Sequence, residues 1–425
     1  VLSGADDGVA GGPSLWRNEH FKVAAETELG LAAITTIMLS MAMGDCGSPH
    51  GDSDNLHLWD SSRLIALVKD DEWTDASRTR PVAIGETLRR LTGKCLLRSR
   101  REACERRALS INNLAFSPDG CSNVVKLIQL YRHHHPDHAV LTTDVETAFQ
   151  SAPRSQMERE LYADADLRPL LPYFYALYAD EASLFFGDDV LKSKEGCQQG
   201  CSLGTLLYIL SIIPVIETLQ EEFPSCTLLG SVDDYYIMGP PEDAAKCLRR
   251  YGELLEARDQ RLNFSKGWAL CSAADLTHPA LLALNADLQV KLTARGIEVL
   301  GSPVGNAAFS CDFVMDKIRS NSELLEEIEK LASHDNKAAA QSALLLLRYC
   351  ALPAVSHLLR TVPTPLADAA FIHHDDAVLH TVSKLIAPTD PLFRTPTEAD
   401  LRDDFTSQHQ RHARLQLQLP VGGEA

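Results

Sequence analysis

Apolar and polar residues near the middle of the chain are arranged as two short strands around one pair of adjacent aspartates. Residues 227–232 and 235–238 are rich in aliphatic, β-branched and aromatic side chains, a composition typical of strands. A tight connection between them would place Asp233 and Asp234 at the tip of a hairpin. The pattern therefore predicts a hairpin that presents two carboxylates.

Two further segments upstream of this hairpin have patterns that bear on it. Residues 139–144 form an apolar strand that ends in Asp144 and runs into a helix-like segment. Residues 196–204 hold three glycines and paired glutamines, and they lead into an apolar helix predicted over 205–219. Glycines let such a loop approach a ligand closely with its backbone.

The pattern in the N-terminal third of the chain predicts helices and one pair of strands. A helical stretch ends near Gly44, and its apolar run 29–43 is too short to span a bilayer, so we expect a buried helix there. Strands are predicted over 62–69 and 80–84. A later helix is predicted to begin at about Ser122, which is a good N-cap residue.

From Phe313 onward the apolar period becomes helical. Further apolar helical stretches cover 343–347 and 366–386, and beyond Pro388 the polar, proline-containing end predicts a linker or a disordered tail. One helix face is predicted to hold Leu324, Leu325, Ile328 and Leu331.

The three carboxylates suggest chemistry with hard cations. Mg²⁺ prefers carboxylate oxygens and commonly takes one or two of them from a protein. The simpler interpretation of Asp233 and Asp234 is an ordinary turn, because adjacent aspartates are frequent in turns. Asp144, at the end of a second strand, gives the metal-site interpretation its weight.

Five segments in this order resemble the palm motifs of reverse transcriptases of the non-LTR retrotransposon type. The segments are "TTDVETAF", "GCQQGCSLGTLLY", "SVDDYYIMG", "LNFSKG" and "VLGSPVG". Upstream, "SRLIALVK" and "RPVAIGETLRRL" resemble the family's fingers motifs, and "LLLLRYCALPAVSHLLRTVP" resembles its thumb helices. The resemblance extends from about Gly12 to about Pro388.

The resemblance implies an α+β fold of the right-hand polymerase type, with an antiparallel-sheet palm flanked by helices. It implies RNA-directed DNA synthesis on a primer 3′-hydroxyl, with an RNA template, a DNA or RNA primer and deoxynucleoside triphosphates. The implied segments are an N-terminal extension (1–58), fingers (59–138), palm (139–306, with a fingers insertion at about 150–195), a helical thumb (307–388) and a polar tail (389–425).

The resemblance also implies a two-metal site. Asp144, Asp233 and Asp234, with the carbonyl of Val145, would hold two Mg²⁺ ions, with Mn²⁺ as an alternative. Lys266 matches the family lysine that is proposed to protonate the departing pyrophosphate, and its alternative role is that of an exposed loop lysine.

Other residues would contact the nucleotide and the primer. Phe149 stands where the family places an aromatic ring beneath the nucleotide sugar, and a core phenylalanine is the alternative interpretation. The implied nucleotide contacts are Lys69, Arg80, Phe149, Gln199 and Gly200, and the implied primer contacts are Gly301, Ser302 and Gly305. Where the family commonly has a glutamine and a glycine, this chain has Asn112, Asn113 and Ala115.

The net charge of −18 is unusual for a protein that binds nucleic acid, because phosphate contacts come from Lys and Arg. Residues 88–107 are the exception, since eight basic and two acidic side chains give this segment a net charge of +6. Two interpretations stay open for the segment: a template or primer track, and a solvated helix face.

The cysteines and histidines of the sequence do not indicate a disulfide framework or a zinc site. The eleven cysteines, scattered without a Cys-x-x-Cys pair, fit reduced thiols in the nucleus or cytoplasm. The histidines around Pro136 and those at 373, 374 and 380 are more typical of solvated surface than of zinc sites. Because Val1 is no initiator methionine, we expect a piece of a larger intracellular polyprotein without a membrane segment.

The sequence leaves three candidate functions open. A reverse transcriptase is favoured by the spacing from Asp144 to Phe149, the Gln-Gly loop and the "GSPVG" segment. An RNA-dependent RNA polymerase would need the same aspartates but usually has Gly-Asp-Asp at the hairpin. A decayed or domesticated polymerase fold that only binds nucleic acid is the remaining alternative, which the acidic surface favours.

Overall fold

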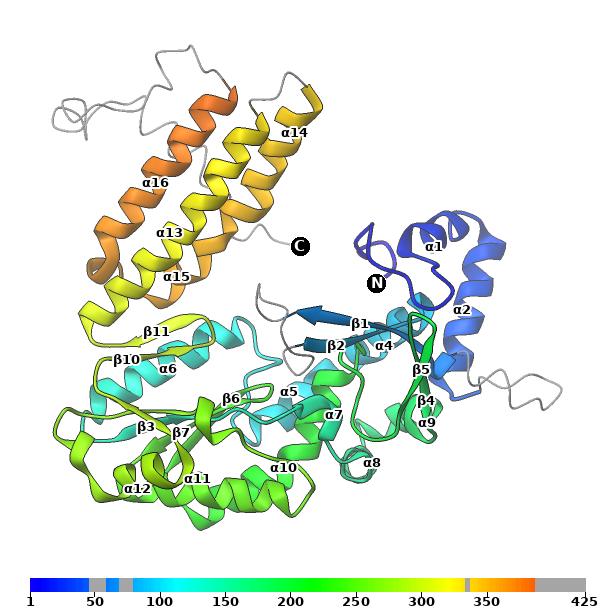
Figure 1. The fold of residues 1–425 in the computed structure, drawn as a ribbon. Coiled ribbons are helices and arrows are strands. Elements are labelled where there is room, and N and C mark those ends of the chain that lie inside the picture. The colour runs from blue at the N-terminus through cyan, green and yellow to red at the C-terminus, as the bar shows by residue number, and fades with distance from the viewer. Residues whose placement is uncertain (46–58, 69–78, 333–336, 387–425) are drawn as a thin grey trace. The chain divides into compact units, whose positions relative to one another are not determined.

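A computed structural model describes residues 1–45, 59–68, 79–332 and 337–386 of the 425-residue chain. The described chain is of mixed α+β type, with several sheets and many helices (Figure 1). It divides into two compact units, the first ending at Leu300 and the second beginning at Gly301. The predicted polar tail 389–425 lies outside the described residues.

A five-stranded sheet forms the centre of the first unit, in the order β6-β7-β3-β8-β9. The strands are β3 (Ala139–Thr142), β6 (Thr227–Ser231), β7 (Asp234–Gly239), β8 (Trp268–Leu270) and β9 (Lys291–Thr293). β3 pairs antiparallel with β7 and β8, and β8 pairs parallel with β9. The predicted hairpin is present, but Asp234 already belongs to β7, because it pairs with Ser231 across a two-residue loop.

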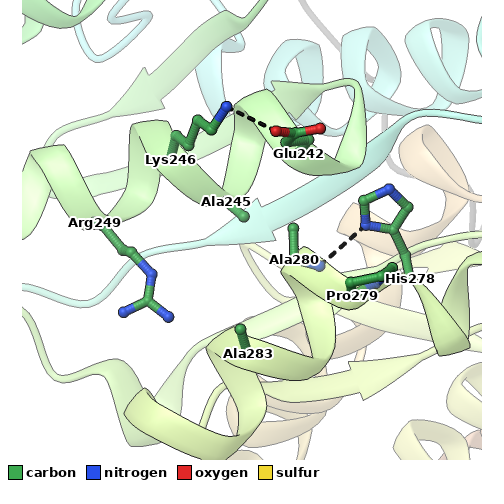
Figure 2. A pocket seen from close by; sticks show the side chains of 8 residues that line it. All are labelled: Glu242, Ala245, Lys246, Arg249, His278, Pro279, Ala280 and Ala283. Carbon is green, nitrogen blue, oxygen red and sulfur yellow. Dashed lines mark hydrogen bonds and ion pairs between the residues drawn. The ribbon is translucent and has the colours of Figure 1, made fainter.

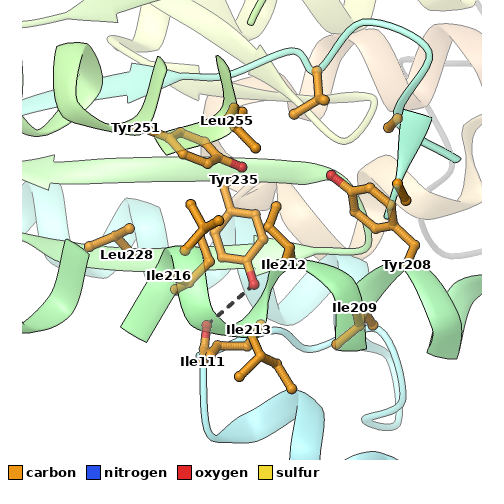
Figure 3. Packing of buried hydrophobic residues seen from close by; sticks show 14 of the residues in the cluster. Ile111, Tyr208, Ile209, Ile212, Ile213, Ile216, Leu228, Tyr235, Tyr251 and Leu255 are labelled. Atoms are coloured by element: carbon orange, nitrogen blue, oxygen red, sulfur yellow. Dashed lines mark hydrogen bonds between the residues drawn. The ribbon is translucent and has the colours of Figure 1, made fainter. Parts of the chain in front are cut away.

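Helix α10 (Gly204–Glu222) supplies most of the core against this sheet. It is apolar on nearly all sides, which predicts a helix buried all round, and its side chains are buried along almost the whole length. Tyr208, Ile212 and Ile216 of α10 lie with Tyr235 of β7 and Tyr251 of α11 (Pro241–Glu256) in one apolar cluster (Figure 3). This packing holds β7 against α10 and α11.

A second sheet of four strands has the order β2-β1-β4-β5. Its strands are β1 (Ser62–Val68), β2 (Thr79–Gly85), β4 (Ala182–Phe186) and β5 (Asp189–Ser193). The strands predicted over 62–69 and 80–84 form the antiparallel pair β1–β2. The hairpin β4–β5 was not predicted, and it joins this sheet because β4 pairs parallel with β1.

The remaining helices of the first unit surround these sheets. They are α1 (Asn18–Ala24), α2 (Glu28–Ala42), α4 (Thr87–Ser99), α5 (Arg101–Leu109), α6 (Gly120–His134), α7 (Ala148–Ser151), α8 (Arg154–Ala163), α9 (Leu171–Tyr178) and α12 (Pro279–Leu288). The strand β10 (Gly296–Val299) ends the unit.

Two details of the sequence interpretation are wrong in this region. Helix α2 is not buried: Ile34 and Met41 face inward, whereas Leu29 is 83% exposed, because neighbouring elements cover only one narrow stripe of the helix. Ser122 is not the N-cap of α6, since the helix begins two residues earlier, after Asp119, and the Ser122 hydroxyl donates to the Asp119 carboxylate at 2.8 Å.

The second unit is helical apart from β11 (Ser302–Gly305). Its helices are α13 (Ala307–Ala332), α14 (Lys337–Leu346), α15 (Ser356–Thr361) and α16 (Thr364–Ile386). The predicted apolar face is confirmed, since Leu325 and Ile328 are buried and Leu324 and Leu331 pack beside them. By length and composition alone, the helical run Ala338–Thr361 could cross a membrane, with a mean hydropathy of 1.5, although core helices of soluble proteins pass the same test.

Candidate active site

The three predicted carboxylates converge from two neighbouring strands. Thr142 of β3 pairs with Tyr236 of β7 in antiparallel register. Asp144 lies two residues after Thr142 and Asp234 two residues before Tyr236, so the register brings the two aspartates opposite each other. The Thr143 N–H and hydroxyl, which both donate to the Tyr235 carbonyl at 3.1 and 2.9 Å, continue the pairing up to this point.

The electrostatics of the hairpin reflect this convergence. Burial, together with the negative charges of Asp233 and Asp144, raises the pKa of Asp234 to about 6. Burial and the charge of Asp144 also raise the pKa of Asp233, which its own backbone N–H opposes. The positive charge of Arg80 partly offsets the rise in both pKa values. This exposed residue of β2 therefore lies within electrostatic reach of the pair.

Lys266 contacts the first of the three carboxylates. Its Nζ lies 3.1 Å from Asp144 Oδ2, and the two side chains are 58% and 41% exposed. The contact is positioned by the backbone, because the Asn263 N–H donates to the Asp144 carbonyl at 2.8 Å and begins the 3₁₀ turn Phe264–Lys266. An exposed pair of this kind contributes little to stability. The contact is therefore of interest for the chemistry of the site rather than for the stability of the fold.

Val145 is buried and forms an isolated bridge with Leu262. Within the described parts of the chain, no three His, Cys, Asp or Glu side chains are arranged so that they could hold one metal ion. The aspartates thus offer the oxygen donors that Mg²⁺ prefers without forming a closed ligand set, since Asp144 is engaged with Lys266.

Phe149 lies on α7, directly after this strand end. Its ring stacks on Tyr208 with centroids 5.4 Å apart and an interplanar angle of 19°. The ring is half-buried, so one face contacts the core while part of the side chain stays accessible. Both interpretations of Phe149 are compatible with this position.

The glutamine-glycine loop lies against β2, the strand that carries Arg80. The Ala83 N–H donates to the Gln199 carbonyl at 2.8 Å. Gly200 has a φ of +117°, and a Cβ atom there would lie 2.5 Å from the Ala83 carbonyl oxygen, so only glycine fits. The glycines of this loop predict a close approach of its backbone to a ligand, and the close approach that the structure describes is to β2.

Sequence reasoning missed the role of the first glutamine of the pair. The Gln198 side chain is buried, and its Oε1 accepts hydrogen bonds from Arg89 Nη2 at 2.8 Å and from the Ser62 hydroxyl at 2.7 Å. The Arg89 guanidinium also donates to the Asp60 carbonyl at 2.8 Å. These bonds join the loop, β1 and α4.

The basic segment 88–107 is neither a continuous track nor a uniformly solvated face. Arg89 is buried, as described above. Arg106 lies 2.9 Å from both Asp164 and Asp166, and Arg107 pairs with Glu160. The exposed members of the segment that remain are Lys94, Arg98 and Arg101.

Four predicted residues belong to other parts of the chain. Lys69 is outside the described residues. Gly301, Ser302 and Gly305 belong to the second unit, where the Ser302 hydroxyl is buried against the Thr361 hydroxyl at 2.9 Å. Gly301 has a φ of +78°, and its carbonyl lies 3.0 Å from His357 Nε2.

A separate pocket of about 360 Å³ lies between α11 and α12 (Figure 2). Alanines 245, 280 and 283 form part of its wall. His278 Nδ1 accepts from the Ala280 N–H at 3.3 Å, which caps α12, and Lys246 pairs with Glu242 at 2.8 Å. None of the predicted site residues lines this pocket.

Comparisons with known proteins give structural likeness only. No protein-family model matches the chain, and no curated protein matches it. A solved structure of apo telomerase from Candida tropicalis, truncated from the C-terminal domain, aligns over 50% of this chain and 50% of its own, at 10% identity and a TM-score of 0.36. A second structure of apo telomerase from the same organism aligns over 85% of this chain and 68% of its own, at 10% identity and a TM-score of 0.43. This chain thus spans about half the length of the first of these structures.

Proposed function

We propose that this chain is an RNA-directed DNA polymerase of the non-LTR retrotransposon type. The observation that carries the proposal is the register between β3 and β7, which brings Asp144 opposite the hairpin of Asp233 and Asp234. In this proposal the five-stranded sheet is the palm, the four-stranded sheet belongs to the fingers, and the helices after β11 form the thumb.

The metal ions of the proposal would be held by Asp144, Asp233 and Asp234, with the Val145 carbonyl as a further ligand. The raised pKa values of Asp233 and Asp234 support this role, because carboxylates that repel each other in a half-buried site are stabilised by a divalent cation. The chemistry that bound Mg²⁺ supplies is activation of a 3′-hydroxyl and neutralisation of charge on the transferred phosphate.

The chain's own residues would bind and orient the substrates. Arg80 would hold the triphosphate, and Lys266 would donate a proton to the departing pyrophosphate from its place beside Asp144. Phe149 would exclude a 2′-hydroxyl and so select deoxynucleotides. Gln199 and Gly200 would contact the template base and the nucleotide. RNA template, primer and deoxynucleoside triphosphates are the partners, in a protein of the nucleus or cytoplasm.

A decayed or domesticated polymerase fold that binds nucleic acid without activity is the second candidate. The net charge of −18 and the internal use of Arg89, Arg106 and Arg107 argue against polymerase activity, because few of the clustered basic groups remain to hold a template–primer duplex. An RNA-dependent RNA polymerase would use the same aspartates and is the third candidate.

Primer extension on an RNA template separates the three candidates. We expect Mg²⁺-dependent incorporation of deoxynucleotides, and Asp144→Asn and Asp234→Asn should each lower the rate on the order of 10³-fold because each removes one charged ligand. Asp166→Asn is the matched control, since this exposed acid only pairs with Arg106. Incorporation of ribonucleotides would point to an RNA polymerase, and duplex binding at low salt without synthesis would point to the binding protein.

A further inference from the structure

The residue before the aspartate pair has an unfavourable backbone conformation. Val232 has a φ of +58°, a region that β-branched residues almost never adopt, at a cost of about 1–3 kcal/mol. It is the first residue of the two-residue loop between Ser231 and Asp234, where glycine is normally required. Because Asp233 is the next residue, the direction of its side chain depends on Val232 keeping this conformation.

One buried side chain contacts both polar groups of Val232. The Asn113 Oδ1 accepts from the Val232 N–H at 3.1 Å, and the Asn113 Nδ2 donates to the Val232 carbonyl at 2.9 Å. An amide side chain offers one acceptor and one donor side by side, so it pairs with the loop residue as a neighbouring strand would. Asn113 is completely buried, which strengthens both bonds and makes their loss costly.

The amide of Asn113 is itself held in place. Its Nδ2 also donates to the Tyr235 hydroxyl at 3.2 Å, and that hydroxyl donates to the Ile111 carbonyl at 3.4 Å (Figure 3). The Asn113 N–H donates to the Ala108 carbonyl at 2.9 Å, and the Leu114 N–H donates to the Gly230 carbonyl at 2.8 Å. Segment 112–114 therefore lies along β6 as an additional, rigid partner.

We propose that Asn113 is a positioning residue that holds the strained Val232 and thereby aims Asp233 toward Asp234 and Asp144. The catalytic consequence of this proposal rests on the proposed function. The two hydrogen bonds from Asn113 to Val232, which we call the clamp, stand on geometry alone. Asn113 touches no reacting group in this scheme. It acts through the backbone of Val232.

The test combines a substitution at Asn113 with relief of the strain it holds. Asn113→Asp keeps the size and the acceptor but loses the donor to the Val232 carbonyl, and Asn113→Ala removes both bonds. We expect each to lower kcat about 10²-fold and to raise the Mg²⁺ concentration needed for half-maximal rate, since a displacement of about 1 Å has effects of that size. Adding Val232→Gly should restore at least a tenfold rate to Asn113→Ala, because glycine adopts a positive φ without strain.

Amide exchange provides a readout that does not need activity. Protection of the Val232 amide should be lost in Asn113→Ala, which removes its acceptor, and kept in the matched control Asn112→Gly. Asn112 has a φ of +53° and bonds through its side chain only to the Leu228 carbonyl, at 3.1 Å, away from the loop. Unchanged protection of the Val232 amide in Asn113→Ala, or no rescue by Val232→Gly in a variant that melts normally, would overturn the proposal. An inactive wild type with the expected protection pattern would refute the proposed polymerase while supporting the clamp.

Discussion

The hairpins β6–β7 and β4–β5 have nearly the same local geometry and opposite surroundings. Each has a two-residue loop whose first residue has a φ of +58°: Val232 in one and Gly187 in the other. A Cβ atom on Gly187 would meet nothing within 4 Å, whereas Val232 is held on both polar groups by Asn113. A turn in open space thus uses the residue that suits it, and a turn with rigid partners can keep one that does not.

The side chains along the two hairpins differ in the same way. Residues 235–239 of β7 are all buried, and Tyr235 is completely so. In β5, residues 189–192 are exposed, and Phe185 and Phe186 of β4 are 39% and 44% exposed. The hairpin that carries the aspartate pair is therefore the more rigid one, as expected of an element that must hold charged groups in fixed positions.

The largest effect should come from truncating one aromatic residue in each hairpin. Tyr235→Ala removes a completely buried ring and two hydrogen bonds, and we expect a loss of about 3–5 kcal/mol in the free energy of unfolding. Phe185→Ala removes a ring that is 39% exposed and should cost below about 1.5 kcal/mol. Urea denaturation measures both, and equal losses would show that the hairpins are equally supported.

An intermediate effect should appear in the pH dependence of stability without metal ions. The folded state raises the pKa of Asp234 to about 6, whereas an unfolded aspartate titrates near 3.9. The folded chain therefore binds this proton more tightly, and stability contributed by Asp234 is lost as the pH rises from about 4 to about 6.

Urea denaturation in EDTA at pH 4.5 and pH 7 checks this dependence. Asp234→Asn should remove part of the decrease, on the order of 1 kcal/mol. Asp188→Asn, in the exposed hairpin loop, serves as the control and should leave the decrease as in the wild type. If Asp234→Asn also loses stability in parallel with the wild type, the repulsion at the β7 hairpin is negligible.

The smallest effect should come from Val232→Gly, the milder of two exchanges at the first loop residues. Gly187→Val should cost about 1–2 kcal/mol, all of it from the backbone, because the added side chain meets no neighbour. Val232→Gly should change stability by less than about 1 kcal/mol, since relief of strain offsets lost packing of the valine against the core. Thermal unfolding of the two variants decides this, and a large loss in Val232→Gly would mean that Val232 is not strained.

Local pattern was sufficient to predict the strands around the aspartates, the helix that became α10 and the apolar face of α13. It was insufficient where a partner distant in sequence decides the outcome. The exposed α2 and the unpredicted hairpin β4–β5 depend on which neighbours cover them, and no periodicity reports that. Asn113 was visible only as a departure from a family pattern, because its partner Val232 lies 119 residues further along the chain.

The pairing of β1 with β4 joins Ser62 to Leu184, whereas β6 and β7 join across two residues. Closing a long loop costs more chain entropy than closing a hairpin, so the four-stranded sheet should assemble later than the β6–β7 hairpin during refolding. During synthesis on a ribosome the order is constrained further, since β1 and β2 emerge long before β4 exists. Until then, β1 would present an unpaired edge to other chains, and an unpaired edge favours aggregation of the newly made protein.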